Sequence, residues 1–555
     1  MTDRFRIALA QLNPTMGDIP GNLRRAKEAR ADAAKAGADL ILFPELYIVG
    51  YPPEDLVLKP ALQDDAREAI EKFAKDTADG GPAVLIGAPW VEAGKLYNAC
   101  MLLDGGKVAG KTFKVDLPNY GVFDEKRVFA PGPMPGPLNI RGIRIGVPVC
   151  EDIWKPDVVE CLAETGAEIL LVPNGSPYES GKEDERLNLI VARVKESGLP
   201  LAYLNQVGGQ DELVFDGGSM VVNADASLAL AMPCWEEKLV VTDWSRTDKG
   251  WVCAKGEVAK EEDRLTSIYN AMVLGLRDYV NKNRFPGVVL GLSGGIDSAI
   301  SAAVAVDALG AARVRCVMLP SRYTSQDSLD DAEECAKMLG VKYETVPIEG
   351  AVDAFTKALA STFTGKNSDT TEENLQSRTR GVILMAISNK FGPMVLTTGN
   401  KSEMSVGYAT LYGDMCGGYN VLKDVYKTDV FKLCHWRNAN VPAIGLGPKG
   451  RVIPERIITK PPSAELRDNQ KDQDSLPPYD ILDGILECLV EKEMTFEATC
   501  ARGYHPATVK RVEQLLYVSE YKRRQAPPGV KITRKNFGRD RRYPITNAFR
   551  DARDV

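Results

Sequence analysis

The chain has 555 residues, of which 44% are hydrophobic and 26% charged, and its formal net charge is −7. These values are ordinary for a globular protein of several domains, and the negative charge argues against a general nucleic-acid or membrane-surface binder. No apolar run is long enough to span a bilayer, and the N-terminus runs straight into a strand-like segment instead of a signal peptide. The eleven cysteines form no Cys-x-x-Cys pair. We therefore expect reduced thiols and a cytoplasmic protein with no membrane or nucleic-acid partner.

The first half of the chain alternates short apolar strands with helical patterns. Asp104-Gly105-Gly106 predicts a hairpin turn, and a helix is expected over 22–36 with Gly37 at its C-terminal cap. This mixture favours a layered α/β sandwich. The strands that we expect here are 6–11, 40–43, 83–86, 99–103, 143–149, 169–172 and 202–205.

A change of composition marks the middle of the chain. Residues 244–260 are polar and charged, which predicts a linker between domains 1–260 and 261–555. A helical pattern over 261–282 then leads into a second α/β unit with a glycine-rich loop after its first strand. That order favours a doubly wound parallel sheet with a nucleotide at the carboxyl ends of its strands. Its strands are expected at 288–290, 314–319, 343–347 and 394–398.

Two later segments are read from composition alone. Residues 459–479 are polar and rich in proline, which predicts a mobile loop. Many Lys and Arg residues follow from Lys522 onward, and we interpret most of them as a solvated face, although substrates that carry phosphates give a local reason for some.

The most informative motif is Ser293-Gly294-Gly295-Ile296-Asp297-Ser298, which joins an apolar strand to a helix. Free backbone N–H groups and the helix N-terminus favour an anion, and Asp297 is placed to hold a cation beside phosphates. No Lys follows the glycines, so the loop does not fit the kinase and GTPase pattern. An ordinary glycine-rich turn is the alternative. The run resembles the SGG-x-DS pyrophosphate loop of ligases that release AMP and pyrophosphate.

Three positions in the first half carry reactive side chains at strand edges. Cys150 follows a strand, Glu45 ends another, and Lys114 precedes the segment 115–125. Taken singly, the thiol fits a buried filler, the carboxylate a helix cap and the amine a solvated charge. Together they supply the nucleophile, the base and the positive group that amide hydrolysis needs.

The segments around these three residues resemble the nitrilase, or carbon–nitrogen hydrolase, superfamily, and 117–125 resembles its glutaminase members. The resemblance implies a Glu-Lys-Cys triad on an αββα sandwich. Cys150 would attack the carboxamide of glutamine, Glu45 would take the thiol proton and later activate water, and Lys114 would stabilise the tetrahedral intermediate. The residues implied to position glutamine are Tyr120, Ser176 and Lys182. The turn-rich loop that ends at Lys182 also fits a plain surface turn.

The second half resembles NAD synthetases in the loop above and in 373–380, 397–403 and 423–428. The resemblance implies that ATP adenylates the nicotinate carboxylate of deamido-NAD, and that ammonia then displaces AMP in the final step of NAD biosynthesis. Asp297 and Glu403 would hold Mg²⁺. The implied ATP-binding residues are Gly291, Leu292, Ser293, Gly294, Gly295, Ile296, Asp297, Ser298 and Thr398. The implied deamido-NAD-binding residues are Asn374, Arg378, Glu403, Lys427 and Lys522.

Both resemblances together predict a nitrilase-type αββα sandwich followed by a doubly wound, Rossmann-like α/β domain of the adenine nucleotide alpha hydrolase type. The expected substrates are glutamine, ATP and deamido-NAD, and the expected assembly is a homo-oligomer. Two alternatives stay open. One is a nitrilase-type amidase with a non-catalytic nucleotide-binding regulatory domain, and the other is a ligase with another acceptor, as in GMP or asparagine synthetases. AMP release with each acceptor distinguishes them.

Overall fold

The computed structural model describes residues 3–551, and contacts divide the chain into two compact units, Met1–Glu262 and Asp263–Val555. We describe each unit by itself. Within the described residues, no helix combines the length and the apolar character that crossing a bilayer requires.

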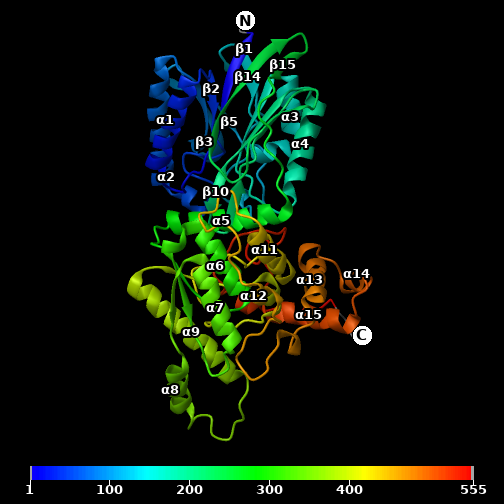
Figure 1. Ribbon diagram of the computed structural model, residues 1–555. Helices are drawn as coiled ribbons and strands as arrows, with labels where there is room; N and C mark the ends of the chain where they lie inside the picture. The colour runs from blue at the N-terminus through cyan, green and yellow to red at the C-terminus, as the bar shows by residue number, and fades with distance from the viewer. Residues whose placement is uncertain (1–2, 552–555) are drawn as a thin grey trace. The chain divides into compact units, whose positions relative to one another are not determined.

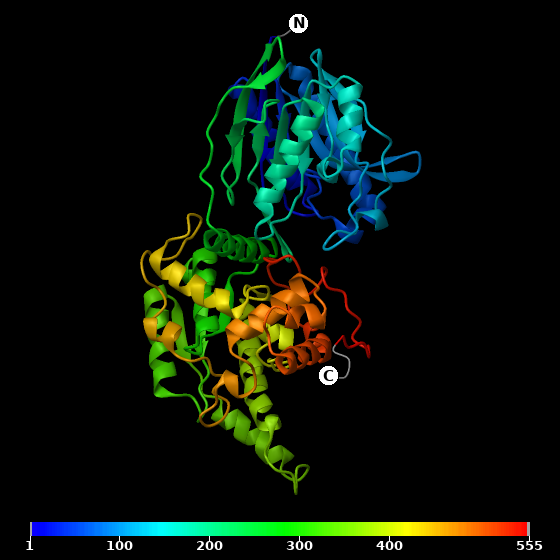
Figure 2. The ribbon, with the colours of Figure 1, turned by 90° about the vertical axis from the view of Figure 1, so that its right-hand side faces the viewer.

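The first unit contains two large sheets that lie face to face between two pairs of helices (Figures 1 and 2). The seven-stranded sheet has the order β15-β14-β1-β2-β3-β4-β5, and the six-stranded sheet has the order β13-β12-β9-β8-β7-β6. Helices α1 and α2 cover the first sheet, and α3 and α4 cover the second. This is the predicted αββα sandwich.

The elements of the first unit follow in chain order. The strands are β1 (Arg4–Gln11), β2 (Leu40–Leu42), β3 (Ala83–Glu92), β4 (Lys95–Asp104), β5 (Lys107–Phe113), β6 (Leu138–Ile140), β7 (Ile143–Gly146), β8 (Ile169–Asn174), β9 (Leu201–Asn205), β10 (Val207–Gln210), β11 (Leu213–Asp216), β12 (Met220–Val222), β13 (Leu228–Ala231), β14 (Lys238–Thr247) and β15 (Gly250–Cys253). The helices are α1 (Ile19–Lys35), α2 (Pro60–Asp76), α3 (Asp157–Glu164) and α4 (Lys182–Ser197).

The central strands β1, β2, β8 and β9 of this sandwich are largely apolar on both faces because both faces are buried. In β1, Ala8 and Ala10 pack toward α1 and α2, whereas Ile7 and Leu9 belong to the core between the sheets. Successive side chains of a strand point to opposite faces, so a strand buried on both sides reads as a continuous apolar run.

Two sequence predictions need correction in this unit. The predicted linker is wrong over 244–253, because β14 pairs with β1 and β15 pairs with β14. Trp244 and Trp251 are each 2% exposed, and the polar residues that suggested a linker occupy the outward positions of this hairpin. Helix α1 begins three residues earlier than expected, because the Asp18 carboxylate accepts a hydrogen bond from the Gly21 N–H at 3.1 Å and caps the first turn.

The second unit is built on a five-stranded, all-parallel sheet with the order β18-β17-β16-β19-β20. The strand order reverses beside β16, which confirms the predicted doubly wound topology. The strands are β16 (Val288–Gly291), β17 (Val314–Met318), β18 (Lys342–Thr345), β19 (Met394–Thr397) and β20 (Tyr419–Asn420). The helices are α5 (Arg264–Lys282), α6 (Ile296–Leu309), α7 (Gln326–Leu339), α8 (Glu349–Leu359), α9 (Thr370–Phe391), α10 (Lys401–Val406), α11 (Lys427–Ala439), α12 (Glu455–Thr459), α13 (Tyr479–Leu486), α14 (Phe496–Cys500), α15 (Pro506–Val518) and α16 (Glu520–Arg523).

The basic tail of the second unit is less solvated than its composition indicates. Lys531 is 3% exposed and pairs with Asp540 at 2.8 Å. Arg523 and Arg541 are also buried, and both contact the Glu520 carboxylate at 2.7 Å. The interpretation of the tail as a mostly solvated face is therefore wrong for these three cations, each of which has an acidic partner inside the fold.

Candidate active sites

The two sheets of the first unit bring Glu45, Lys114 and Cys150 to one buried place. Glu45 follows β2, Lys114 directly follows β5, and Cys150 opens a short 3₁₀ turn after β7. The side chains of Glu45 and Lys114 are fully buried, and the Lys114 Nζ donates to Glu45 Oε1 at 2.7 Å. A solvated lysine and a surface helix cap, the alternatives that each residue allowed alone, are excluded by this burial.

The Glu45 carboxylate is held by three donors. Besides Lys114, the Asn98 side chain donates to Oε1 at 2.8 Å, and the Gly175 N–H donates to Oε2 at 2.9 Å. Gly175 follows β8, so this carboxylate is held from both sheets. The position of this carboxylate is therefore fixed, as a general base requires.

Cys150 has a strained backbone, with φ at +48°. Such a conformation is uncommon for a residue other than glycine and is often found where a nucleophile is presented at a sharp turn. Burial, and next the charge of Glu45, raise the pKa of the Cys150 thiol well above its ordinary value. The resting group is therefore a thiol, and attack on a carbonyl requires a base beside it.

Lys114 remains charged although it is buried. Burial alone would lower its pKa, but the carboxylates of Glu125 and Glu45 outweigh that effect and hold the pKa well above its ordinary value. Glu125 accepts from Lys114 at 2.9 Å and from the Tyr51 hydroxyl at 2.8 Å. A fixed ammonium beside the thiol is the kind of group that stabilises an oxyanion.

The three residues proposed to position glutamine differ in their surroundings. Tyr120 is 54% exposed and its hydroxyl donates to the Glu151 carboxylate at 3.0 Å. Ser176 is buried, and its N–H donates to Asn205 Oδ1 at 2.9 Å, so the loop after β8 is not a plain surface turn at this position. Lys182 begins α4, and its Nζ lies 5.9 Å from the centre of the Trp154 ring.

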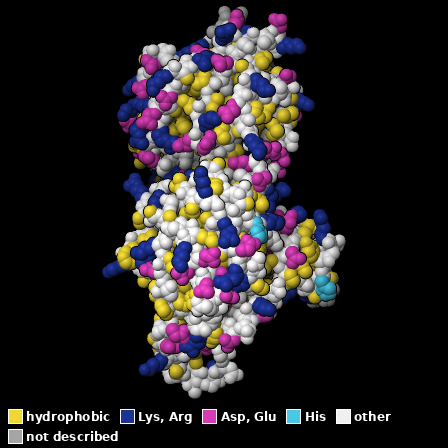
Figure 3. Space-filling model, viewed as in Figure 1, with side chains coloured by type: hydrophobic (Ala, Val, Ile, Leu, Met, Phe, Trp, Pro, Cys, Tyr) yellow, Lys and Arg dark blue, Asp and Glu magenta, His cyan; other side chains and the backbone are white. Residues whose placement is uncertain are grey.

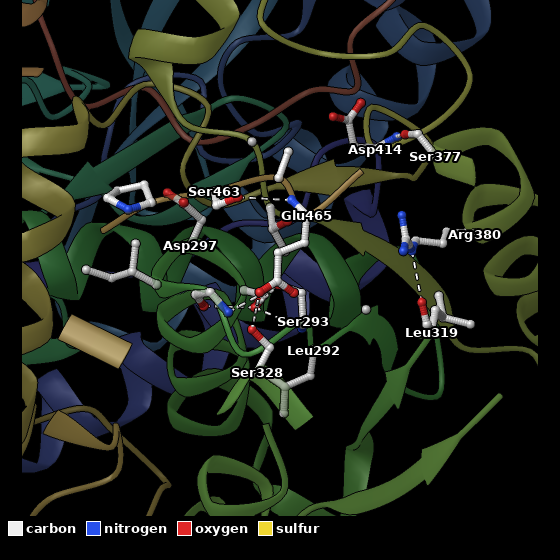
Figure 4. Close-up of a pocket in the computed structure, with 18 of the residues that line it drawn as sticks. Leu292, Ser293, Asp297, Leu319, Ser328, Ser377, Arg380, Asp414, Ser463 and Glu465 are labelled. Carbon is white, nitrogen blue, oxygen red and sulfur yellow. Dashed lines mark hydrogen bonds between the residues drawn. The ribbon is translucent and has the colours of Figure 1, made fainter. Parts of the chain in front are cut away.

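The second unit has a cavity of about 320 Å³ at the carboxyl ends of its parallel strands. Of the predicted ATP-binding residues, eight line it directly, namely Gly291, Leu292, Ser293, Gly295, Ile296, Asp297, Ser298 and Thr398. Figure 4 shows the labelled lining residues. The cavity lies where ligands bind in doubly wound sheets.

The glycine-rich loop between β16 and α6 has a fixed conformation. Gly294 has φ at +76°, and a Cβ at this position would lie 2.3 Å from the Ser328 carbonyl oxygen. The Ser298 hydroxyl accepts from the Ser293 N–H at 3.2 Å and donates to the Gly295 carbonyl at 2.9 Å. Only glycine fits this close approach. The N-terminus of α6 faces the cavity, which is the arrangement that favours binding of an anion such as phosphate.

Two carboxylates share one lysine inside this cavity. The Lys427 Nζ contacts Asp297 Oδ2 and lies 3.2 Å from Glu403 Oε1. Asn400 donates to Asp297 Oδ1 at 2.9 Å, and it caps α10 by accepting from the Glu403 N–H at 3.0 Å. Burial raises the pKa of Glu403 to about 8, an effect to which Asp297 adds and which Lys427 opposes.

The donor set of this site fits a magnesium–nucleotide complex. Within residues 3–551, no group of three or more His, Cys, Asp or Glu side chains is placed to hold a metal ion. Mg²⁺ commonly uses one or two carboxylates and completes its shell with substrate phosphates and water. Asp297 and Glu403 face the cavity together and match that requirement.

Three predicted deamido-NAD contacts gather on another segment, 407–411. The Asn374 side chain accepts from the Thr410 hydroxyl at 2.9 Å, and Arg378 donates to the Leu411 carbonyl at 3.2 Å. Lys522 donates to two carbonyls of the same segment, at 2.8 and 2.7 Å. These three residues do not line the cavity, whereas Glu403 and Lys427 do.

Several residues of the sites carried no sequence signal. Lys460 donates to the Gly294 carbonyl at 3.2 Å and to the Ser328 hydroxyl at 3.0 Å. Glu465 accepts from the Ser325 and Ser328 hydroxyls at 2.7 and 2.8 Å, and Figure 4 shows it beside the loop of Ser293. Both come from 459–479, whose composition indicated only a loop; Lys460 contacts the glycine-rich loop and Glu465 contacts the start of α7.

Charges of both signs are mixed on the face of the molecule that Figure 3 shows. Lys and Arg side chains alternate there with Asp and Glu side chains on each unit. A nucleic-acid binder typically carries a continuous basic patch.

Two family models match the chain, "Carbon-nitrogen hydrolase" over residues 6–248 and "NAD synthase" over residues 268–526. A glutamine-dependent NAD(+) synthetase of Rhodobacter capsulatus is 54% identical over 99% of this chain and 100% of its own length. The chain belongs to the glutamine-dependent NAD(+) synthetase family. It is therefore a ligase that forms NAD with ammonia derived from glutamine.

Other members of the family agree over the full length. The synthetase of Xanthomonas campestris pv. campestris is 48% identical over 98% of each chain. The solved synthetase of Acinetobacter baumannii, in complex with ADP, is 43% identical and has a TM-score of 0.78, with 99% of this chain and 100% of that chain covered. The Cytophaga hutchinsonii synthetase is 23% identical with a TM-score of 0.83 over 98% of each chain, which supports the fold.

Proposed function

We propose that residues 1–260 form the glutaminase domain and 261–555 the NAD synthetase domain, with the catalytic and binding residues assigned as follows. In the first domain Glu45 removes the thiol proton of Cys150 as the sulfur attacks the carboxamide carbon of glutamine. Lys114 stabilises the negative oxygen, and Glu45 returns the proton to the amide nitrogen, so that the C–N bond breaks and ammonia leaves. Glu45 then activates the water that hydrolyses the thioester to glutamate. Tyr120, Ser176 and Lys182 position glutamine.

The contact that carries this assignment is the fully buried Lys114–Glu45 pair at 2.7 Å beside a cysteine with a positive φ. A buried charge pair has a large desolvation cost and is weak evidence for a purely stabilising role. The raised pKa of Cys150 supplies the reason for a base, because a thiol that is not ionised cannot attack alone.

In the second domain we propose that the loop 291–298, with Thr398, binds ATP. Asp297 and Glu403 would hold the Mg²⁺ that accompanies ATP, which would supply positive charge to neutralise the phosphates. Asn374, Arg378, Glu403, Lys427 and Lys522 bind deamido-NAD, whose nicotinate carboxylate is adenylated with loss of pyrophosphate. Ammonia then displaces AMP to give NAD. The relatives that match over both domains support this ligase and disfavour an amidase with a non-catalytic nucleotide module.

A substitution at Cys150 tests the assignment of the first domain. We expect Cys150→Ala to abolish NAD formation from glutamine, while NAD formation from ammonium stays within about threefold of the parent, since the second domain is untouched. Cys161→Ala is the matched control, because this thiol lies on α3 and is also free. Glutamine-driven synthesis at the parental rate in Cys150→Ala would show that another group is the nucleophile.

The compartment and the assembly are also part of the proposal. All eleven cysteines are free, as a reducing cytoplasm would keep them. The predicted homo-oligomer is measured by sedimentation equilibrium of the purified chain, where a monomer at micromolar concentration would contradict it.

A further inference from the structure

The proposed triad is divided between two sheets. Lys114 follows β5, the edge strand of the seven-stranded sheet, whereas Cys150 follows β7 of the six-stranded sheet. Among the described strands, β5 pairs only with β4, and β7 pairs only with β6 and β8. No ladder of backbone hydrogen bonds therefore fixes the nucleophile relative to the ammonium, and side chains must supply that connection.

Asp152 makes this connection with three backbone hydrogen bonds. Its Oδ1 accepts from the N–H groups of Val115 and Asp116, at 2.9 and 2.8 Å, directly after Lys114. Its Oδ2 accepts from the Val149 N–H at 2.9 Å, directly before Cys150. One residue, which is 1% exposed, thus joins the two residues after Lys114 to the residue before Cys150.

We infer that Asp152 is a positioning residue of the glutaminase, which sets the Cys150 sulfur against the Lys114 ammonium across the two sheets. The inference rests on the proposed triad. A carboxylate is suited to this role, because its two oxygens accept from donors on both sides. Cys150 has a left-handed backbone conformation, which persists only where surrounding contacts hold it. The position of its sulfur therefore depends on the hydrogen bonds of the neighbouring backbone.

Two other contacts link the same segments, but they lie at the surface. Lys155 donates to Asp116 Oδ1 at 2.8 Å, and its side chain is 62% exposed. Tyr120, which we assign to glutamine binding, contacts Glu151. An exposed ion pair contributes little, so the Lys155 contact offers a matched control that joins the same segments without burial.

The test substitutes Asp152 by its neutral isostere. In Asp152→Asn the amide oxygen can accept on one side only, while the NH₂ group faces a backbone N–H on the other, so at least one buried N–H loses its partner. We expect kcat of glutamine-driven NAD formation to fall about tenfold or more with KM for glutamine within about threefold. We also expect the rate at which iodoacetamide alkylates Cys150 to fall about tenfold; peptide mass spectrometry measures this rate. Ammonium-driven synthesis should stay at the parental rate.

Lys155→Met is measured in parallel and should retain the parental kcat and alkylation rate. An unchanged kcat in Asp152→Asn, a rise in KM alone, or an equal loss with ammonium would each overturn the inference; the last would indicate general unfolding, which a thermal melt identifies. If Cys150→Ala keeps glutamine-driven activity, the triad itself is wrong. A defective Asp152→Asn beside an inactive Cys150→Ala supports both proposals.

Discussion

Replacing Glu45 by Gln preserves the shape of the side chain but removes the base. Oε1 would keep its contacts with Lys114 and Asn98, whereas the new NH₂ group would face the Gly175 N–H that now donates to Oε2 at 2.9 Å. An unpaired buried donor costs about 1–3 kcal/mol. Loss of the negative charge at position 45 destabilises the fold further. This second loss is smaller than that of a fully broken buried ion pair, which is about 3–5 kcal/mol, because Lys114 keeps its contact with Glu125 at 2.9 Å.

The kinetic effect of Glu45→Gln should exceed its effect on stability. A positioned general base contributes about 10²–10⁴-fold, so glutamine-driven NAD formation should fall by that factor. Ammonium-driven formation should change less than about threefold, since the substitution lies in the other unit. NAD formation from each nitrogen source and urea unfolding measure these two quantities. A loss of less than tenfold with glutamine, or equal losses with both sources, would refute the role of Glu45 as base.

Three further outcomes follow from the structure. Asp297→Asn should abolish synthesis from both glutamine and ammonium while glutamine hydrolysis persists, as measured by AMP and glutamate release; ammonium-driven synthesis at the parental rate would exclude Asp297 from the ATP site. Lys531→Met removes the cation that lies 2.8 Å from the buried Asp540 carboxylate. The free energy of unfolding of the second unit, measured with denaturant, should therefore fall by about 3–5 kcal/mol. A fall below about 1 kcal/mol, typical of an exposed pair, would contradict the burial. With labelled ammonium and unlabelled glutamine together, NAD should carry little label, and heavy labelling at modest ammonium would show that ammonia escapes between the two reactions.

The positions that the sequence identified best are those at strand ends. Glu45, Cys150 and the loop from Ser293 to Ser298 each begin within four residues of the end of a strand, and a buried strand determines where its next residues lie. The conformation of this loop, which we propose binds phosphate, depends on local backbone geometry, and a glycine at position 294 makes that geometry predictable from the sequence.

Contacts between distant segments left no comparable pattern. Glu125 and Asn98 become partners of the triad only when β4 and β5 fold beside β2 and β3, and each lies in a run that reads as ordinary. Burial of Lys531 and Arg541 depends on partners that composition cannot pair with them. The Pro-rich segment 459–479 looked like a bare loop because its contacts are made by single side chains, Lys460 with the glycine-rich loop and Glu465 with the start of α7.

The pairing of β1 with β14 has a consequence during synthesis on the ribosome. Strand β1 lies between β2 and β14 in the sheet, and its partner β14 begins only at Lys238. At roughly 5–20 residues per second, β1 leaves the ribosome about 10–50 s before that partner is made. An apolar strand with an unpaired edge is an aggregation hazard. The nascent first unit therefore needs protection by a chaperone or by its own incomplete sheet until the last tenth of that unit has emerged.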